Sequence, residues 1–364
     1  MTSAEAPPVA PRRRPQFHPL RVASVEHLTD DAVAVTFDVP AELTEDYRFQ
    51  PGQALTLRRV DGDRDERRSY SICAPMGDPP RVGVREVPGG FFSSYLVHDV
   101  RPGDTIDVLP PSGTFTADLG SPGDHVFVVA GSGITPALSL AGTVLRDGTS
   151  TVTVFYGNRR TNTVMFADEL ADLKDRHGPR LQLVHVLSRE PRDTELTSGR
   201  LDGARLRTLV GNLVDVEQVD HWWLCGPHGM VDDARALLAE LDVPAGRVHQ
   251  ELFYVDDVPP EPVRGDEETV AGPSSQVTVV LDGRSTTLSL ARDVPVLDSA
   301  QQVRGDLPFA CKGGVCGTCR ARVTEGEVRM RRNYALEAAE VEAGYVLTCQ
   351  SLPVSDALTV DYDA

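Results

Sequence analysis

The sequence predicts three folded domains in series: an antiparallel β-barrel, a doubly wound α/β domain and a smaller C-terminal α+β domain. Three observations support this division. The first hundred residues contain short β-type runs separated by Gly, Pro and Asp. After about residue 120, apolar strands alternate with helix-type segments. A stretch rich in Pro, Gly and Glu then precedes a final segment with renewed β patterning. A chain of 364 residues is long enough for several separate cores.

The barrel is predicted within residues 16–118, after a flexible tail at 1–15. Frequent turns between short strands favour an antiparallel barrel or sandwich, and "FFSSYLVHDV", residues 91–100, is the one helix-like interruption. The expected strands are 21–29, 32–39, 53–60, 68–74, 81–87 and 104–110.

Residues 119–256 predict the α/β domain. Its first strand, "HVFVVA", leads into a glycine turn and a helix. Strands and helices then continue to alternate, as expected for a parallel sheet. The strands are expected at 125–130, 151–157, 181–188 and 221–226, and the helices at 131–148, 163–178, 204–213 and 230–241.

Residues 257–274 have little hydrophobicity and predict an inter-domain linker. The last domain, 275–364, opens with the β pattern "QVTVVLDGRSTTLSL".

The composition restricts the class of partner and the compartment. A formal net charge of −18 argues against nucleic acid or an anionic membrane surface as the main partner. The sequence contains no apolar run of about 18 residues, as a spanning helix requires, and no apolar signal-peptide core at its start. We therefore expect a cytoplasmic protein, in which six cysteines do not indicate disulfides.

The segment "CKGGVCGTC" gives the most specific motif in the chain. Cys311, Cys316 and Cys319 follow the spacing C-x4-C-x2-C, and Cys349 follows after 29 intervening residues. This is the plant-type spacing for a [2Fe–2S] cluster. A zinc site is the alternative, but zinc ribbons usually add a second C-x2-C or a His pair, and no His follows His249. The glycines at 313, 314 and 317 would let backbone N–H groups approach the sulfurs.

Two motifs in the barrel predict a flavin site. In "RRSYSICAP", Arg68 could meet a phosphate, Tyr70 offers a flat ring on the same face of the strand, and Ser71 could hydrogen-bond the flavin ring. An ordinary strand with an exposed Arg is the alternative. In "VPGGFFSSYL", a helix start supplies amides for an anion, or is merely a capped helix entry. Its candidate residues are Gly89, Gly90 and Ser93.

Two motifs in the α/β domain predict a nicotinamide dinucleotide site. "VVAGSGITPALS" is a strand, a glycine turn and a helix, and Gly131 and Gly133 would let the backbone approach a pyrophosphate. It has Pro136 where the dinucleotide fingerprint has a third Gly. "WLCGPHGM" places a second motif at a carboxyl edge of the sheet, although its cysteine could be a small buried hydrophobe. The second motif comprises Cys225, Gly226 and Pro227.

The choice of nicotinamide cofactor depends on two other strand ends. Ser188 and Arg189 could clamp a 2′-phosphate, supported by Arg159 or Arg160. Neither strand ends in the acidic residue that a 2′-hydroxyl reader prefers, which favours NADPH over NADH. Glu190 weakens this inference slightly.

Taken in this order, the motifs resemble the ferredoxin–NADP⁺ reductase superfamily, in its subgroup with a C-terminal plant-type ferredoxin domain. The resemblance covers nearly the whole chain and implies a β-grasp-like last domain. It implies flavin contacts for Arg68, Tyr70 and Ser71, with Phe253 of the "ELF" segment near the flavin. It also implies dinucleotide contacts for the GSGITP turn, which contains Gly131, Gly133, Thr135 and Pro136, and nicotinamide contacts for Cys225, Gly226 and Pro227.

Within the subgroup, "LTEDYRFQPGQALTLR" and "YGNRRTNTVMFADELADLKD" look most like the reductase subunits of phenylacetyl-CoA epoxidases. This resemblance implies an NAD(P)H-dependent oxidoreductase of phenylacetate catabolism that carries electrons from NADPH through FAD and [2Fe–2S] to a di-iron monooxygenase. FMN-using relatives share the domain order. The alternatives are a reductase for a Rieske oxygenase, such as 3-ketosteroid 9α-hydroxylase, and a non-catalytic iron–sulfur redox sensor.

Overall fold

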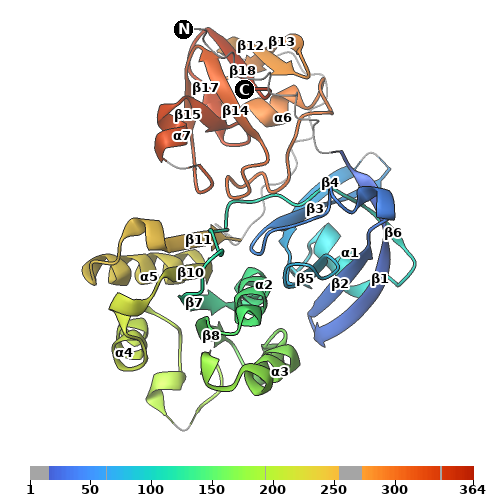
Figure 1. The fold of residues 1–364 in the computed structure, drawn as a ribbon. Coiled ribbons are helices and arrows are strands. Elements are labelled where there is room, and N and C mark those ends of the chain that lie inside the picture. Colours follow the sequence, from blue (N-terminus) through green and yellow to red (C-terminus); the bar gives the residue numbers. More distant parts are fainter. Residues whose placement is uncertain (1–15, 63, 193, 254–272, 337) are drawn as a thin grey trace, which may run out of the picture.

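The computed structural model describes residues 16–364 apart from 63, 193, 254–272 and 337. The predicted tail, and the predicted linker up to residue 272, therefore lie outside the described residues. Figure 1 shows three ribbon regions, one for each predicted domain. Among the helices of the described ranges, none combines the length and apolar character that a membrane span requires.

The first region is a six-stranded antiparallel sheet in the order β4-β3-β6-β1-β2-β5. Pairing of Ile72 with Val82 brings the end of β4 back to β5, so the sheet closes into a barrel. Phe92 and Leu96, one turn apart on α1 (Phe91–His98), are buried in the barrel core. The strands are β1 (His18–Thr29), β2 (Ala32–Asp38), β3 (Ala54–Asp61), β4 (Arg64–Ser71), β5 (Arg81–Arg85) and β6 (Thr105–Val108).

The second region is a parallel sheet in the order β11-β10-β7-β8-β9. Alternate residues of β7 point to opposite faces: Phe127 packs in a core with α2 and α3, whereas Val128 packs in one with α4 and α5. The strands are β7 (Asp124–Ala130), β8 (Thr151–Asn158), β9 (Leu181–Leu187), β10 (His221–Gly226) and β11 (Val248–Leu252). The helices are α2 (Ile134–Val144), α3 (Ala167–His177), α4 (Gly203–Leu213) and α5 (His228–Glu240).

Two elements of this region differ from the prediction. The edge strand β11 was not expected, because its sequence "VHQEL" is short and largely polar. Helix α3 begins at Ala167 rather than at residue 163, because Phe166 adopts a left-handed conformation (φ 57°) that cannot continue a helix.

The third region is a mixed sheet in the order β13-β12-β18-β14-β16, in which β12 and β18 are parallel. A two-stranded ladder, β15 (Val328–Met330) with β17 (Ser351–Pro353), lies beside it. The multidomain fold class predicted from the sequence is therefore confirmed. The main strands are β12 (Ser274–Leu281), β13 (Arg284–Ala291), β14 (Arg320–Glu325), β16 (Tyr345–Leu347) and β18 (Ala357–Asp361), with short helices α6 (Val296–Ala300) and α7 (Ala338–Glu342).

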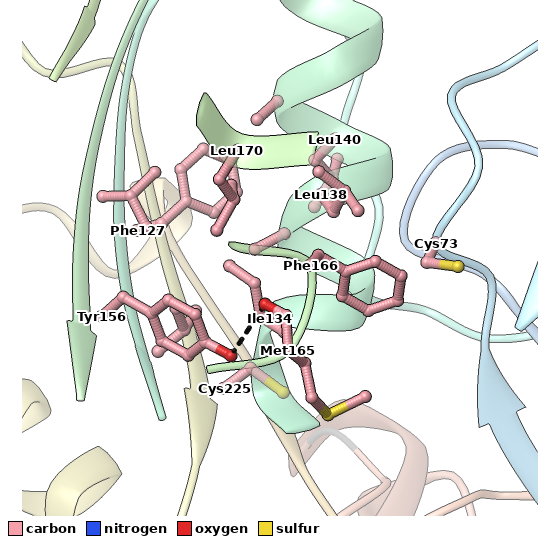
Figure 2. Packing of buried hydrophobic residues seen from close by; sticks show 14 of the residues in the cluster. Cys73, Phe127, Ile134, Leu138, Leu140, Tyr156, Met165, Phe166, Leu170 and Cys225 are labelled. Carbon is pink, nitrogen blue, oxygen red and sulfur yellow. Dashed lines mark hydrogen bonds between the residues drawn. The ribbon is translucent and has the colours of Figure 1, made fainter. Parts of the chain in front are cut away.

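The barrel and the α/β region share one hydrophobic core. Ala34, Cys73 and Phe115 of the first region belong to the same buried cluster as Phe127 and Leu138 of the second. Figure 2 shows Cys73 at one side of this cluster, with Phe166 and Leu138 between Cys73 and Phe127 of the sheet. The ferredoxin-type region packs around a separate core of its own residues. The first two regions thus form one packed unit.

Candidate functional site

The structure brings the four motif cysteines together in two pairs. The neighbouring Cys311 thiol raises the pKa of Cys316, and the neighbouring Cys349 thiol, with a smaller contribution from Cys316, raises the pKa of Cys319. Cys311 and Cys316 are partly exposed, whereas Cys319 and Cys349 are buried. The described residues contain no group of three or more side chains arranged around one metal ion. Two cysteine pairs suit two irons better than a single tetrahedral zinc.

The loop around these cysteines also suits an iron–sulfur cluster. The Gly313 N–H donates to Cys311 Sγ at 3.3 Å, and Gln350 Nε2 lies 3.7 Å from Cys349 Sγ. Gly314 and Gly317 have positive φ angles (82° and 68°) that side chains with a Cβ rarely adopt. Hydrogen bonds to the sulfurs are one of the means by which a protein tunes such a cluster.

The two predicted flavin motifs meet in the barrel. The ring of Tyr70 lies edge-on to that of Phe92, with centroids 6.3 Å apart, so the strand motif contacts the first turn of α1. Gly90 must be a glycine, because a Cβ there would approach Ser93 Oγ to 2.6 Å. Gly89 has a φ of 74° and open space beside it. A small anion could therefore approach the backbone at this helix start.

Two of the polar side chains in these motifs already have partners within the protein. Ser93 Oγ accepts a hydrogen bond from the Val87 N–H at 3.0 Å. Arg68 forms an ion pair with Glu66 at 2.8 Å, so its guanidinium is not a free phosphate ligand in this arrangement.

A buried polar junction joins the barrel to the α/β domain. Ser71, at the end of β4, donates a hydrogen bond to the Glu251 carboxylate at 3.0 Å. Glu251 lies on β11 directly beside Cys225 of β10. Burial raises the pKa of Glu251 to about 7, and the hydrogen bond from Ser71 partly opposes this shift. Burial, reinforced by Glu251, also raises the pKa of Cys225, which is therefore a neutral thiol.

The two predicted dinucleotide motifs pack against each other. A Cβ at Gly133 would lie 2.1 Å from the Cys225 carbonyl oxygen, which allows only glycine there. A Cβ at Gly226 would lie 2.7 Å from Met230 Cε. These glycines allow the GSGITP turn and the C-G-P edge to meet at the carboxyl end of the sheet, where ligands of such folds bind.

The start of α2 also contacts the barrel. Thr135 is buried, and its methyl group would lie 2.5 Å from a Cβ at Gly83 of β5. Pro136 follows in the first turn of α2, Pro227 immediately precedes α5, and Phe253 packs against the shared core. The predicted nicotinamide residues therefore lie at the boundary between the two domains.

Buried polar groups at this edge test whether a dinucleotide fits. Asn158, at the end of β8, is only 8 % exposed. Neither the nitrogen nor the oxygen of its side-chain amide makes a well-aligned hydrogen bond, although the amide lies near Tyr156. Gly131 has a φ of 56°, and Arg85 Nη1 lies 3.3 Å from the place of a Cβ on it. The unsatisfied Asn158 amide suits a polar ligand, whereas Arg85, although it lies beside the glycine turn, already forms an ion pair with Asp31 at 3.4 Å.

Sequence reasoning missed Arg85 and Asn158. Arg85 ends β5, and no spacing in the sequence relates it to a glycine turn in another domain. Asn158 lies within the "YGNRR" segment, but the sequence does not show that its side chain is buried.

The candidate 2′-phosphate residues are brought together only in part. The Ser188 N–H donates to the Asn158 carbonyl and the Arg189 N–H to the Arg159 carbonyl, so the ends of β8 and β9 are adjacent. Arg159, however, forms an ion pair with Asp31 of the barrel at 3.3 Å. Glu190 accepts hydrogen bonds from the Thr161 backbone N–H and hydroxyl. An acidic residue therefore does lie at this edge, which weakens the argument for NADPH over NADH.

The ferredoxin-type region contacts both other regions through aromatic rings. The guanidinium of Arg67, in the barrel, lies 4.4 Å from the centroid of the Phe309 ring. Lys312 belongs to the same domain as Phe309, and its Nζ lies 4.9 Å from that centroid. Tyr334 meets His228, at the start of α5, edge-on at 5.7 Å. Phe309 precedes Cys311 by two residues, so the cysteine loop is near the reductase core.

These features define a class of protein: a reductase with a flavin-type barrel, a nicotinamide-type domain and an iron–sulfur domain in one chain. Family models agree with this division. An oxidoreductase FAD-binding domain matches residues 19–117, an oxidoreductase NAD-binding domain matches 127–236, and a 2Fe-2S iron-sulfur cluster binding domain matches 279–354.

Proteins that are similar along nearly the whole chain narrow the class of reductase. The chain is 42% identical over 353 residues to the E subunit of 1,2-phenylacetyl-CoA epoxidase from Escherichia coli, covering 96% of this chain and 98% of that protein. It is 34% identical to the ferredoxin reductase component of a 3-ketosteroid-9-alpha-monooxygenase of Rhodococcus rhodochrous, covering 94% and 96%.

A solved structure shows the same fold. Phthalate dioxygenase reductase aligns with a TM-score of 0.60 at 23% identity, covering 95% of this chain and 98% of the other. The chain belongs to the family of ferredoxin–NADP⁺ reductase-type oxidoreductases with a C-terminal 2Fe-2S domain, which includes the E subunit of phenylacetyl-CoA epoxidase. It is an NAD(P)H-dependent flavin and iron–sulfur oxidoreductase.

Proposed function

We propose that this protein is the cytoplasmic reductase component of a multicomponent oxygenase, which receives electrons from NADPH and passes them to a di-iron monooxygenase. Two observations together carry this proposal. The four motif cysteines lie as two neighbouring pairs, and Ser71 of the flavin motif bonds Glu251, which lies beside Cys225 of the dinucleotide motif. A bound FAD would supply the conversion between two-electron hydride transfer and single-electron transfer that the cluster requires.

The residues of the barrel and the α/β domain would position the reactants. The hydroxyl of Ser71, held by Glu251, would fix one edge of the flavin ring, and Tyr70 would cover it. Cys225 would contact the nicotinamide as a neutral thiol, without moving a proton. The remaining flavin residues would be Gly89, Gly90 and Ser93, together with Arg68, whose guanidinium would have to leave Glu66 to meet a phosphate. Phe253 would lie near the flavin. The remaining nicotinamide residues would be Gly131, Gly133, Thr135, Pro136, Gly226 and Pro227.

The cysteines would ligate the cluster as the two pairs in which they lie. Cys311 and Cys316 would bind one iron and Cys319 and Cys349 the other. We assign the flavin domain to residues 16–118, the nicotinamide domain to 119–256 and the ferredoxin domain to 275–364.

Visible spectroscopy and a Cys316→Ser substitution test the proposal. We expect a coloured protein bleached by NADPH, whereas a colourless protein would contradict the proposal. Cys316→Ser should abolish cytochrome c reduction but retain ferricyanide reduction, because the flavin alone can serve ferricyanide. Cys73→Ala, which removes a buried thiol elsewhere, should retain both activities. Loss of both activities in a folded Cys316→Ser protein would contradict separate flavin and cluster modules.

The 42% identity to the E subunit of phenylacetyl-CoA epoxidase supports that epoxidase as the partner. The test is reconstitution of phenylacetyl-CoA turnover from the purified oxygenase subunits and this protein. No turnover, despite active cytochrome c reduction, would reject this partner while leaving the reductase activity intact.

A second candidate partner is a Rieske oxygenase of the 3-ketosteroid 9α-hydroxylase kind, supported by the 34% identity to one of its reductase components. Parallel reconstitution with both oxygenases discriminates between the candidates, because the true partner should saturate at the lower reductase concentration.

The preference for NADPH rests on Ser188, Arg189, Arg159 and Arg160 near the expected adenosine ribose. Arg159 already pairs with Asp31, so Arg189 is the more informative residue to change. Arg189→Ala should lower kcat/KM for NADPH by up to about five-fold and leave that for NADH nearly unchanged. Equal effects on both cofactors would contradict the proposed 2′-phosphate contact.

A further inference from the structure

A group of arginines lies on the surface of the ferredoxin domain. Arg329 in β15, and Arg331 and Arg332 immediately after it, are all exposed. We call these three residues the basic edge. Met330, between them, turns the other way and accepts a hydrogen bond from the Leu347 N–H. Arg329 and Arg331 therefore share the outer face of the strand.

The basic edge is next to the cysteine loop. The Tyr334 N–H donates to the Gly314 carbonyl at 3.1 Å, and the Arg332 carbonyl lies 3.3 Å from the place of a Cβ on Gly314. The Arg331 N–H donates to the carbonyl of Gln350, the residue after Cys349. The segment that carries the arginines thus borders the loop between Cys311 and Cys316, the more exposed cysteine pair.

Two of these three arginines have no ion-pair partner among the described residues. Arg329 and Arg331 form no ion pair with any side chain that the structure describes. Other basic residues of the domain do: Arg292 pairs with Asp356, Arg304 with Asp306 and Lys312 with Asp298. Acidic residues outnumber basic ones by 54 to 36 in the chain as a whole, so a group of three arginines stands out against a formal net charge of −18.

The edge remains exposed while the ferredoxin domain contacts the reductase core. Phe309 and Tyr334 are engaged by Arg67 and His228, but the three arginines stay accessible to solvent in the same arrangement. An outside protein can therefore approach the cluster loop from this side.

We propose that the basic edge is the docking surface for the electron-accepting protein, and that this partner presents an acidic patch around its own redox centre. The inference rests on the proposed function, in which electrons leave through the cluster. Complementary charge speeds diffusional encounter and fixes the orientation of a short-lived complex, and its effect weakens as salt screens it. Placing the charge beside the more exposed cysteines would keep the transfer distance short.

Two acceptor proteins of opposite charge test this without knowledge of the natural partner. The probes are the soluble domain of cytochrome b5, which is acidic, and cytochrome c, which is basic. The double variant Arg329→Glu/Arg331→Glu should slow cytochrome b5 reduction about ten-fold at low salt and accelerate that of cytochrome c. Both effects should shrink at high salt, while ferricyanide reduction and the cluster's EPR spectrum stay unchanged.

The matched control is Arg235→Glu/Arg284→Glu. It makes the same change in net charge at exposed positions on α5 and on β13, at the edge of the sheet opposite β14 and β16. The proposal would be overturned if the rate of cytochrome b5 reduction changed equally in both double variants, or changed in neither. A wild-type protein that reduced neither cytochrome would instead refute electron exit through the cluster, and the docking surface with it.

Discussion

The two interfaces of this molecule differ in kind. The barrel and the α/β domain share a hydrophobic core, and Arg81 of the barrel forms an ion pair with Glu169 of the α/β domain. Ser139 adds a buried hydrogen bond to the Ala74 carbonyl at 2.6 Å. The ferredoxin domain has its own core, and its contacts with the rest of the molecule include the cation–π contact of Phe309 with Arg67 and the ring pair of Tyr334 with His228.

The difference matches what each interface would have to do. Hydride transfer requires two rings at a fixed distance and angle, so a rigid boundary made of packed side chains suits it. Single-electron transfer to a cluster tolerates more variation in geometry. A lighter contact therefore suffices for the ferredoxin domain, and leaves part of its surface available to a partner.

The strongest test of the rigid interface is Gly133→Ala. Its Cβ would lie 2.1 Å from the Cys225 carbonyl, so the glycine turn and the C-G-P edge must separate. A displacement of this size should slow flavin reduction by NADPH roughly a hundred-fold. Stopped-flow flavin bleaching measures it. Gly229→Ala in α5, where a Cβ meets no atom within 4 Å, is the control and should retain the rate. An unchanged rate in Gly133→Ala would show that the interface is not rigid.

Glu251→Gln tests the same interface by pH. The pKa of Glu251 is raised to about 7 from 4.5, so between these values the folded protein holds a proton that the unfolded chain has lost. The free energy of unfolding should therefore fall as pH rises through this window, by on the order of 2 kcal/mol from this group.

Thermal unfolding of the holoenzyme between pH 4.5 and 8 measures this effect. The Glu251→Gln variant should lose only the pH dependence of stability that the Glu251 carboxyl causes. The difference in Tm between wild type and variant should therefore change with pH. Parallel curves for the two proteins would contradict the raised pKa.

The smallest expected effect is at the lighter interface. Phe309→Leu removes the ring beneath the Arg67 guanidinium while keeping an apolar side chain. The loss of about 1 kcal/mol of cation–π interaction should slow flavin-to-cluster transfer about five-fold and leave the hydride step unchanged. Rapid-scan spectroscopy separates the two steps. Val303→Ala, at an exposed position of the same domain, should change neither. A slower hydride step would show that the two interfaces are coupled.

The sequence predicted the cysteine site best because three of its four candidate ligands lie within nine residues. Their spacing is local, and the turn around them needs glycines that can be read directly, such as Gly314 and Gly317. The barrel and the α/β pattern were also predictable, since apolar periodicity and turn residues are local signals. The ligand roles themselves stay predictions.

The junction residues were harder to place because their relations are tertiary. Ser71 and Glu251 stand 180 positions apart, and only the packed domains reveal their hydrogen bond. Arg85 next to Gly131, and Asp31 opposite Arg159, likewise depend on how the barrel meets the α/β domain. The polar strand β11 gave no periodic signal, although it carries Glu251.

The shared core has a consequence for synthesis on the ribosome. Ala34 and Phe115 are made early, but the residues that cover them, Leu138 and Trp223, come from the later α/β segment. The nascent barrel must therefore expose an apolar face until much of the second domain has emerged. Chains stalled between residues 118 and 223 should be the ones that chaperones hold, whereas the ferredoxin domain, with its own core, can fold last and alone.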